Sequence, residues 1–242
     1  MKNYMLLTQP CTIKETKDFA VVFKPAKMHC VLLGQQTARQ KDGATLQEWF
    51  AAQNPAQNAE PVHRLDFETH GLVLFAKNPK SFKFFKALQD KGEFIKEYSA
   101  VCAVDSLASS VPGFPLPPAF AFEKPLIIES YFRPYGPGRK LVRPVVDEGK
   151  KHKETAKDKG GFYRTEITNI NGNVFTLRLR RGFRHQIRCH LCWIGCPILN
   201  DPLYPQPAQE NAANGLALRA HGLFFTDPAS GKKKECRIAL LA

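Results

Sequence analysis

The chain has 242 residues, of which 43% are hydrophobic and 11% aromatic, so it can bury a substantial core and global disorder is excluded. Its formal net charge of +13 favours a nucleic acid or an anionic membrane as partner, or indicates an ordinary basic protein. A membrane partner is not expected, because no run approaches the ~18 apolar residues of a spanning helix. The start of the chain is too briefly apolar for a secretory signal, so we expect a cytoplasmic protein.

The first third of the chain alternates between strands and helices. Residues 19–23 are continuously apolar and predict a buried strand, which Pro25 ends through its fixed backbone dihedral. Apolar residues at helical spacing predict a helix over 45–52, and an apolar run predicts a strand over 72–77. A second amphipathic helix is predicted over 81–90, with Ser81 as its N-cap.

The middle of the chain has one strand signal and then mostly loop signals. Residues 96–104 alternate and then become apolar, which predicts a strand. Four prolines in 111–118 exclude regular structure there, and residues 133–143 are basic and rich in turn residues. The charge run 150–159 is typical of a solvated loop.

The last third predicts a hairpin, a helix and two closing strands. Asn171-Gly172 is a strong turn signal between strands over 162–170 and 174–180. A helix over 185–194 and strands over 216–225 and 235–241 follow. Because strict strand–helix alternation is missing, a doubly wound parallel sheet is not expected. The pattern predicts one α+β domain over 1–242, with a mixed, mainly antiparallel central sheet and flanking helices.

Two polar stretches stand out as candidates for chemistry. In the first, His63-Arg64-Leu65-Asp66 precedes an apolar run, so that Asp66 lies at the rim of a strand. A partly desolvated carboxylate held ionised by basic neighbours can act as a nucleophile or a base. The alternative is a structural ion pair or a turn cap.

The second stretch, residues 184–191, is rich in cations. Arg184 and Arg188 are four residues apart, so on a helix they would share a face, one pairing with a carboxylate and the other with phosphate. A solvated basic helix face is the alternative. Tyr98 lies near the start of the strand predicted over 96–104 and could stack on a base, or be a half-buried strand aromatic.

The seven cysteines lie mostly among apolar neighbours, which is typical of reduced thiols in a core. Cys189, Cys192 and Cys196 share one helix face with His185 and His190 close by. Zinc sites normally take ligands from two separate elements, and no second cluster is present, so a packing face is favoured over a metal site.

At these residues the chain resembles the RluA family of RNA pseudouridine synthases, over most of its length. The motifs occur in the family's order. They are residues 18–26, residues 63–66 with 69, 71–72 and 75–77, residues 96–100, residues 185–191 with 195, 197–198 and 201–204, and residues 218–225. The resemblance implies a fold with a central RNA-binding cleft and a base-flipping isomerase that acts on uridine in ribosomal or transfer RNA. It also implies no cofactor and no metal.

The resemblance also implies roles for individual residues. Asp66 would be the catalytic aspartate, Tyr98 would stack on the target uracil and help to remove a proton, and Arg188 would pair with Asp66. Further RNA-binding roles follow for a basic set. It comprises His63, Arg64, Arg184 and His185, together with Arg133, Arg139, Lys140 and Arg143 as phosphate contacts.

The chain departs from the family pattern beside the site. His70 stands where the family usually has serine, Lys27 where glycine is usual, and Arg181-Gly182-Phe183-Arg184 replaces the usual Thr-Gly-Arg-Thr. Residues 105–160 are the least family-like. We also expect no N-terminal S4 RNA-binding domain, and a monomer.

Two other functions compete with an active synthase. The first is a non-catalytic RNA-binding or folding module that keeps the synthase fold. The second is a glycoside or nucleoside hydrolase that uses Asp66 with Glu68, which would need two carboxyl groups at a set separation across the scissile bond.

Overall fold

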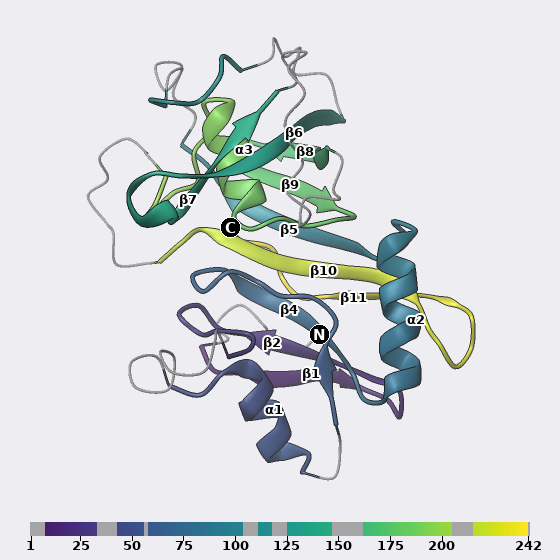
Figure 1. Ribbon diagram of the computed structural model, residues 1–242. Helices are drawn as coiled ribbons and strands as arrows, with labels where there is room; N and C mark the ends of the chain where they lie inside the picture. The colour runs from purple at the N-terminus through teal and green to yellow at the C-terminus, as the bar shows by residue number, and fades with distance from the viewer. Residues whose placement is uncertain are drawn as a thin grey trace. The chain divides into compact units, whose positions relative to one another are not determined.

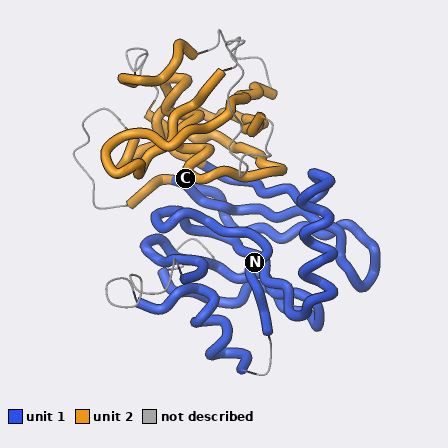
Figure 2. Tube along the Cα trace, in the orientation of Figure 1, with its two compact units in different colours: residues 1–99, 218–242 blue, residues 100–217 orange. Residues whose placement is uncertain are grey.

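The computed structural model describes residues 8–32, 43–55, 58–103, 111–117, 125–146, 162–204 and 215–241. The chain divides into two compact units (Figure 2). Unit 1 comprises residues 1–99 and 218–242, and unit 2 comprises residues 100–217. Unit 1 is therefore built from both ends of the chain. The single-domain organisation over 1–242 stays a prediction.

Unit 1 holds a mixed sheet (Figure 1). Its strands run in the order β1-β2-β4-β10-β5, with β3 paired to β4 and β11 paired to β10. All the pairs with an assigned register are antiparallel except β4 with β10, which is parallel. The strands are β1 (Cys11–Glu15), β2 (Phe19–Lys24), β3 (Glu60–Pro61), β4 (His70–Ala76), β5 (Ile95–Val101, which ends in unit 2), β10 (Leu218–Thr226) and β11 (Lys233–Arg237).

An aromatic core fixes the sheet of unit 1 against helix α2 (Pro79–Asp90). Phe19 of β2 makes edge-to-face contacts with Phe85 of α2 and with Phe225 of β10, at ring-centroid distances of 5.9 and 5.1 Å. Such pairs add to the free energy of area burial. The shorter helix α1 (Leu46–Gln53) buries Leu46 and Phe50, and Phe50 stacks on Phe75 of β4.

Unit 2 has an antiparallel sheet in the order β9-β8-β6-β7. Its elements are β6 (Leu126–Tyr135), the short 3-10 helix η1 (Pro137–Arg139), β7 (Leu141–Val145), β8 (Tyr163–Asn171), β9 (Val174–Leu179) and α3 (Gln186–Trp193). Every residue of α3 is buried, and Cys189 and Cys192 pack with Phe132 of β6 and Val142 of β7. One face of the β6–β7 hairpin is therefore covered by α3.

The predicted fold class is confirmed: the chain is α+β, with few helices and mostly antiparallel strands. The strands over 19–23, 72–77 and 96–104 and the 162–180 hairpin are present with shifted ends, although residue 104 lies outside the described residues. The charge run 150–159 also lies outside them. No helix of the described chain is long and apolar enough to cross a membrane.

Three local predictions are wrong. Asn78, not Ser81, caps α2: its side chain accepts a hydrogen bond from the Ser81 amide at 2.8 Å, and Pro79 occupies the first helical position. Residues 133–143 belong to a β-hairpin, β6–η1–β7. The sequence does not show it, because the arginines on its outward positions and the prolines in both strands obscure the apolar alternation. Arg184 precedes α3, so it does not share a helix face with Arg188.

Candidate active site

Asp66 lies on a tight turn that leads into β4. The amide of Thr69 donates to the carbonyl of Asp66 at 3.1 Å, which closes the turn. The Asp66 side chain is half-buried, whereas its neighbour Arg64 is exposed and Leu65 is buried. The structure therefore presents Asp66 at the rim of a strand, as the sequence predicts.

Hydrogen bonds to the segment after β2 fix the backbone of this turn on both sides of Asp66. On one side the Leu65 amide donates to Cys30 Sγ at 3.2 Å. On the other, the amide of Lys27 donates to the carbonyl of Phe67 at 2.8 Å. Lys27 adopts a positive φ of 58°, a conformation that glycine takes without strain and that the family's usual glycine would suit. The residues immediately before and after Asp66 are thus both held by hydrogen bonds.

Lys24 is a buried cation beside this turn, and sequence reasoning assigned it only to the end of a strand. Its ammonium donates to three carbonyls, those of Pro25 at 2.8 Å, Met28 at 2.7 Å and Phe67 at 3.1 Å. Burial lowers the pKa of Lys24 to about 8, while the nearby charges of Cys30, Asp66 and Glu68 act to raise it. Lys24 is therefore charged at neutral pH, and it favours the ionised form of a neighbouring carboxylate.

Tyr98 of β5 shares the electrostatic environment of Asp66. Its side chain is buried, and burial, followed by the negative charges of Asp66 and Cys30, raises its pKa well above the usual value. The phenol therefore keeps its proton at neutral pH. Within unit 1 the structure thus brings together two of the predicted catalytic residues, Asp66 and Tyr98.

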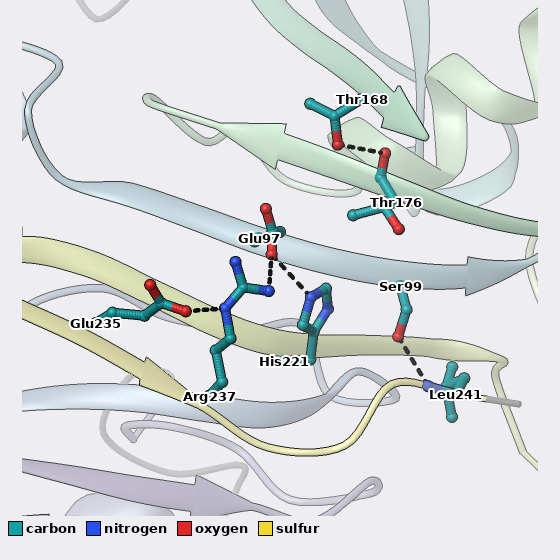
Figure 3. A network of polar contacts seen from close by, with 8 residues as sticks. All are labelled: Glu97, Ser99, Thr168, Thr176, His221, Glu235, Arg237 and Leu241. Atoms are coloured by element: carbon teal, nitrogen blue, oxygen red, sulfur yellow. Dashed lines mark hydrogen bonds and ion pairs between the residues drawn. The ribbon is translucent and has the colours of Figure 1, made fainter. Parts of the chain in front are cut away.

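A buried polar network anchors the opposite side of β5 (Figure 3). Glu97 accepts a hydrogen bond from Arg237 of β11 at 2.7 Å and lies 3.0 Å from His221 Nε2 of β10. Two residues along, Ser99 Oγ accepts a hydrogen bond from the Leu241 amide at 3.1 Å. Because Glu97 and Ser99 flank Tyr98 in the strand, these contacts fix the position of Tyr98.

His63 is a buried neutral histidine rather than an exposed RNA contact. Its Nε2 accepts a hydrogen bond from the Leu74 amide at 3.2 Å, and its ring packs against Phe94. Burial, with the charges of Lys96 and Lys86, lowers its pKa well below the usual range. Direct RNA binding by His63 stays a prediction.

In unit 2, Arg188 forms a buried ion pair with Asp201. Arg188 Nε and Nη2 donate to the two carboxylate oxygens at 2.8 and 2.6 Å. Asp201 Oδ1 also accepts from the amides of Leu203 and Tyr204, and Tyr204 lies under the guanidinium at 5.6 Å. Asp201 was noticed only as part of a motif, and nothing in the local sequence marks it as the partner of Arg188.

Most of the other predicted RNA-binding cations gather at the β6–β7 hairpin. Arg133, Arg139 and Lys140 are exposed and Arg143 is half-buried. The exposed Arg184 donates from Nη2 to the carbonyls of Arg139 and Leu141, at 2.9 and 3.1 Å, so it belongs to the same surface.

His185 begins α3 in a left-handed conformation and is half-buried. Burial, with Arg188 and Arg184 nearby, lowers its pKa to about 3, so it is neutral at physiological pH. Among the residues that the structure describes, no group of three His, Cys, Asp or Glu side chains could hold a metal. His190 instead contacts Ser130 and Thr165, at 3.0 and 2.8 Å.

Comparison with known proteins identifies the family of this chain. A sequence model described as RNA pseudouridylate synthase matches residues 18–193, a span that contains Asp66, Tyr98 and Arg188. The chain belongs to the RNA pseudouridylate synthase family. The expected relation to RluA is confirmed, because RluA proteins are among the relatives of this chain. A dual-specificity RNA pseudouridine synthase RluA of Salmonella typhi is 29% identical over 180 residues, covering 74% of this chain and 73% of that protein.

Two further relatives are longer than the part of them that this chain matches. An uncharacterised RNA pseudouridine synthase of Helicobacter pylori is 31% identical over 85% of this chain but 61% of its own length. An uncharacterised Caenorhabditis elegans protein is 29% identical over 79% of this chain and 38% of its own. The chain therefore spans less than two thirds of these two relatives.

The solved structure of human RNA pseudouridylate synthase domain containing 1 resembles this chain with a TM-score of 0.67. The sequence identity is 18%, and the match covers 96% of this chain and 84% of that one. At this identity the likeness concerns the fold, which agrees with the family assignment.

Proposed function

We propose that this chain is an RNA pseudouridine synthase that isomerises uridine in structured ribosomal or transfer RNA, with Asp66 as the catalytic residue. The observation that carries the proposal is the position of Asp66. It lies in a motif within the matched region and is half-buried. The backbone groups of the residues on either side of it are held by hydrogen bonds, and a buried lysine and a buried tyrosine lie near it. Such support holds a reacting group in one geometry, which lowers the entropic cost of reaction.

The reaction breaks the bond between the ribose C1′ and N1 of uracil, turns the base, and joins C1′ to C5, after which C5 loses its proton and N1 takes up a proton. The target base must first leave its stack, at a cost of a few kcal/mol. Asp66 would drive the bond cleavage, by attack on the sugar or the base or by taking a proton from the sugar. No cofactor or metal is required by this chemistry.

Tyr98 and Arg188 have supporting roles in this proposal. Because Tyr98 keeps its own proton, we assign it to contact with the uracil and to proton relay, in which its oxygen accepts the C5 proton as its own proton passes on. Arg188 is the proposed partner of Asp66. Asp201 binds its Nε and Nη2 and so orients the guanidinium.

The remaining parts of the proposal concern the cellular compartment, the oligomeric state and the contacts with RNA. None of the seven cysteines, all of which the structure describes, is in a disulfide, which agrees with a reducing compartment such as the cytoplasm. We further propose that the protein acts as a monomer on RNA, with phosphate contacts from Arg133, Arg139, Lys140, Arg143 and Arg184 supplying much of the affinity.

The experiment is tritium release from RNA labelled at C5 of uridine, because isomerisation frees that hydrogen. Wild type should release tritium, and Asp66→Asn should not, although it should bind the RNA. Glu68→Gln is the matched control: it removes a half-buried carboxylate two residues away and should stay active. Release of free uracil that Glu68→Gln abolishes would support a hydrolase, and RNA binding by a wild type that releases no tritium would support a non-catalytic module.

A further inference from the structure

The face of the β6–β7 hairpin that α3 does not cover has an unusual composition. Strand residues alternate between faces, and the inward positions, such as Phe132 and Val142, are buried under α3. The outward positions of β6 are half-buried or exposed and include Tyr131, Arg133 and Tyr135. Aromatic and cationic side chains therefore alternate along one exposed strand face.

Neighbouring elements extend this alternation into an aromatic–arginine–aromatic stripe. Next to Tyr131, the Phe162 ring lies at a centroid distance of 4.3 Å and is 47% exposed. Arg133 pairs in register with Arg143 of β7, so two guanidinium groups occupy one position of the ladder. Beyond them, Tyr135 packs against Phe114 at 6.0 Å. We call these six residues the stripe.

The two arginines of the stripe border a cavity of about 380 Å³, which residues 113–115 and 143–146 line together with Arg133. Arg143 Nη1 donates to the carbonyl of Gly113 at 3.0 Å, which fixes one guanidinium at the cavity wall. This volume lies within the range of about 300–1,000 Å³ that is typical of small-molecule sites, so it can hold a nucleotide-sized group.

The charge around the stripe favours an anion. Arg133 and Arg143 face each other across the two strands, so two positive charges lie at one position of the ladder. Arg139, Lys140 and Arg184 add positive charge at the tip of the hairpin. The nearby carboxylate of Glu129 lies beyond Tyr131 and faces Arg164 at 3.9 Å.

We propose that the stripe binds an unpaired stretch of the RNA substrate. One base stacks at Tyr131 and Phe162, another at Phe114 and Tyr135, and a phosphate between them lies at Arg133 and Arg143. Stacking platforms combined with basic side chains are the general mode of single-strand binding. Tyr131 and Tyr135 are four residues apart, about 13 Å along a strand, which leaves room for the intervening backbone. The inference rests on the proposed function in taking RNA as the partner.

Fluorescence anisotropy with a labelled single-stranded oligouridylate tests the stripe. The double variant Arg133→Gln, Arg143→Gln should bind more weakly and reduce the slope of log affinity against log salt by about 0.7, since the one phosphate held by these two arginines contributes about 0.7 on a single strand. Arg133→Lys with Arg143→Lys should keep the slope. Tyr131→Ala with Phe162→Ala should weaken binding about 5- to 150-fold and leave the slope unchanged.

Lys232→Gln with Lys233→Gln is the matched control, because it removes two exposed cations from unit 1. It should change the affinity for the oligouridylate and the salt slope less than the Arg133→Gln, Arg143→Gln variant does. Wild type and the Tyr131→Ala, Phe162→Ala variant should bind a duplex of the same length with equal affinity. An unchanged slope in the arginine variant, or equal effects of the two charge-removing pairs, would overturn the inference.

Tritium release separates this inference from the proposed function. A wild type that isomerises uridine while the stripe variants bind the oligonucleotide normally would refute the stripe and keep the synthase. If wild type releases no tritium, but the stripe variants bind the oligonucleotide more weakly than wild type, the stripe is kept and the synthase is refuted. Circular dichroism of each variant shows that the hairpin still folds.

Discussion

Replacing Asp201 by asparagine should destabilise unit 2, because it removes the charge of a carboxylate that is paired with the buried guanidinium of Arg188. Both side chains are almost fully buried, at 2% and 1% exposure, and two charge-assisted hydrogen bonds join them. Removing one partner of such a pair costs about 3–5 kcal/mol. Asparagine retains an oxygen that can accept from the amides of Leu203 and Tyr204, so we expect the lower end, about 3 kcal/mol.

Urea unfolding followed by Trp193 fluorescence measures this loss, in a Trp49→Phe background that leaves one tryptophan in the chain. A loss of about 3 kcal/mol corresponds to a melting temperature lower by about 6–12 °C in a chain of this size. Glu129→Gln is the matched control in the same unit, since its pair with Arg164 is half-exposed and such pairs contribute about 0–1 kcal/mol. If Asp201→Asn unfolds at the same urea concentration as Glu129→Gln, the ion pair does not stabilise unit 2 and the reasoning is wrong.

Three further changes probe unit 1. Tyr98→Phe should bind RNA normally but slow tritium release, because the ring remains and the relay oxygen is lost; unchanged release would exclude proton relay. His70 Nε2 accepts a hydrogen bond from Arg219 at 2.9 Å, and burial with Arg219 and Lys24 lowers the His70 pKa to about 4. The unfolded chain therefore binds more protons between pH 6.5 and 4, and stability is lost as the pH falls through that window. The urea concentration at the unfolding midpoint should fall less for His70→Ser than for wild type when the pH is lowered from 7 to 4.5. An equal fall would contradict the pKa shift. Gly71 has a φ of 131°, and an added Cβ would overlap the carbonyl of Ala220 in the paired strand β10. Gly71→Ala should therefore lower the melting temperature and tritium release together, and a variant as stable as wild type would contradict the close approach of β4 and β10.

The sequence predicts the parts of this structure that depend on neighbouring residues. The buried run of β2, the Asn171-Gly172 turn and the rim position of Asp66 follow from local patterning and turn chemistry. The β6–β7 hairpin was missed because its prolines and arginines resemble a loop. Pro144 is tolerated there because β7 is an edge strand, where a missing N–H is not needed by the sheet.

Partners that lie far apart along the chain could not be predicted from the sequence. Glu97 meets Arg237 and His221, which are 140 and 124 residues away, and no local pattern identifies them as a set. The burial of Lys24 likewise depends on carbonyls from two separate segments. The roles of Asp66, Tyr98 and Arg188 came from motif resemblance, and their chemistry stays a prediction until it is measured.

Pseudouridine mapping of total cellular RNA tests the catalytic role of Asp66 most directly. Cells that lack the protein would be compared with cells that carry wild type, Asp66→Asn or the control Glu68→Gln, at equal protein levels. We predict one or more uridines that are modified with wild type and with Glu68→Gln but stay unmodified with Asp66→Asn. A site that Asp66→Asn modifies as fully as wild type would contradict the assignment of Asp66 as the catalytic residue.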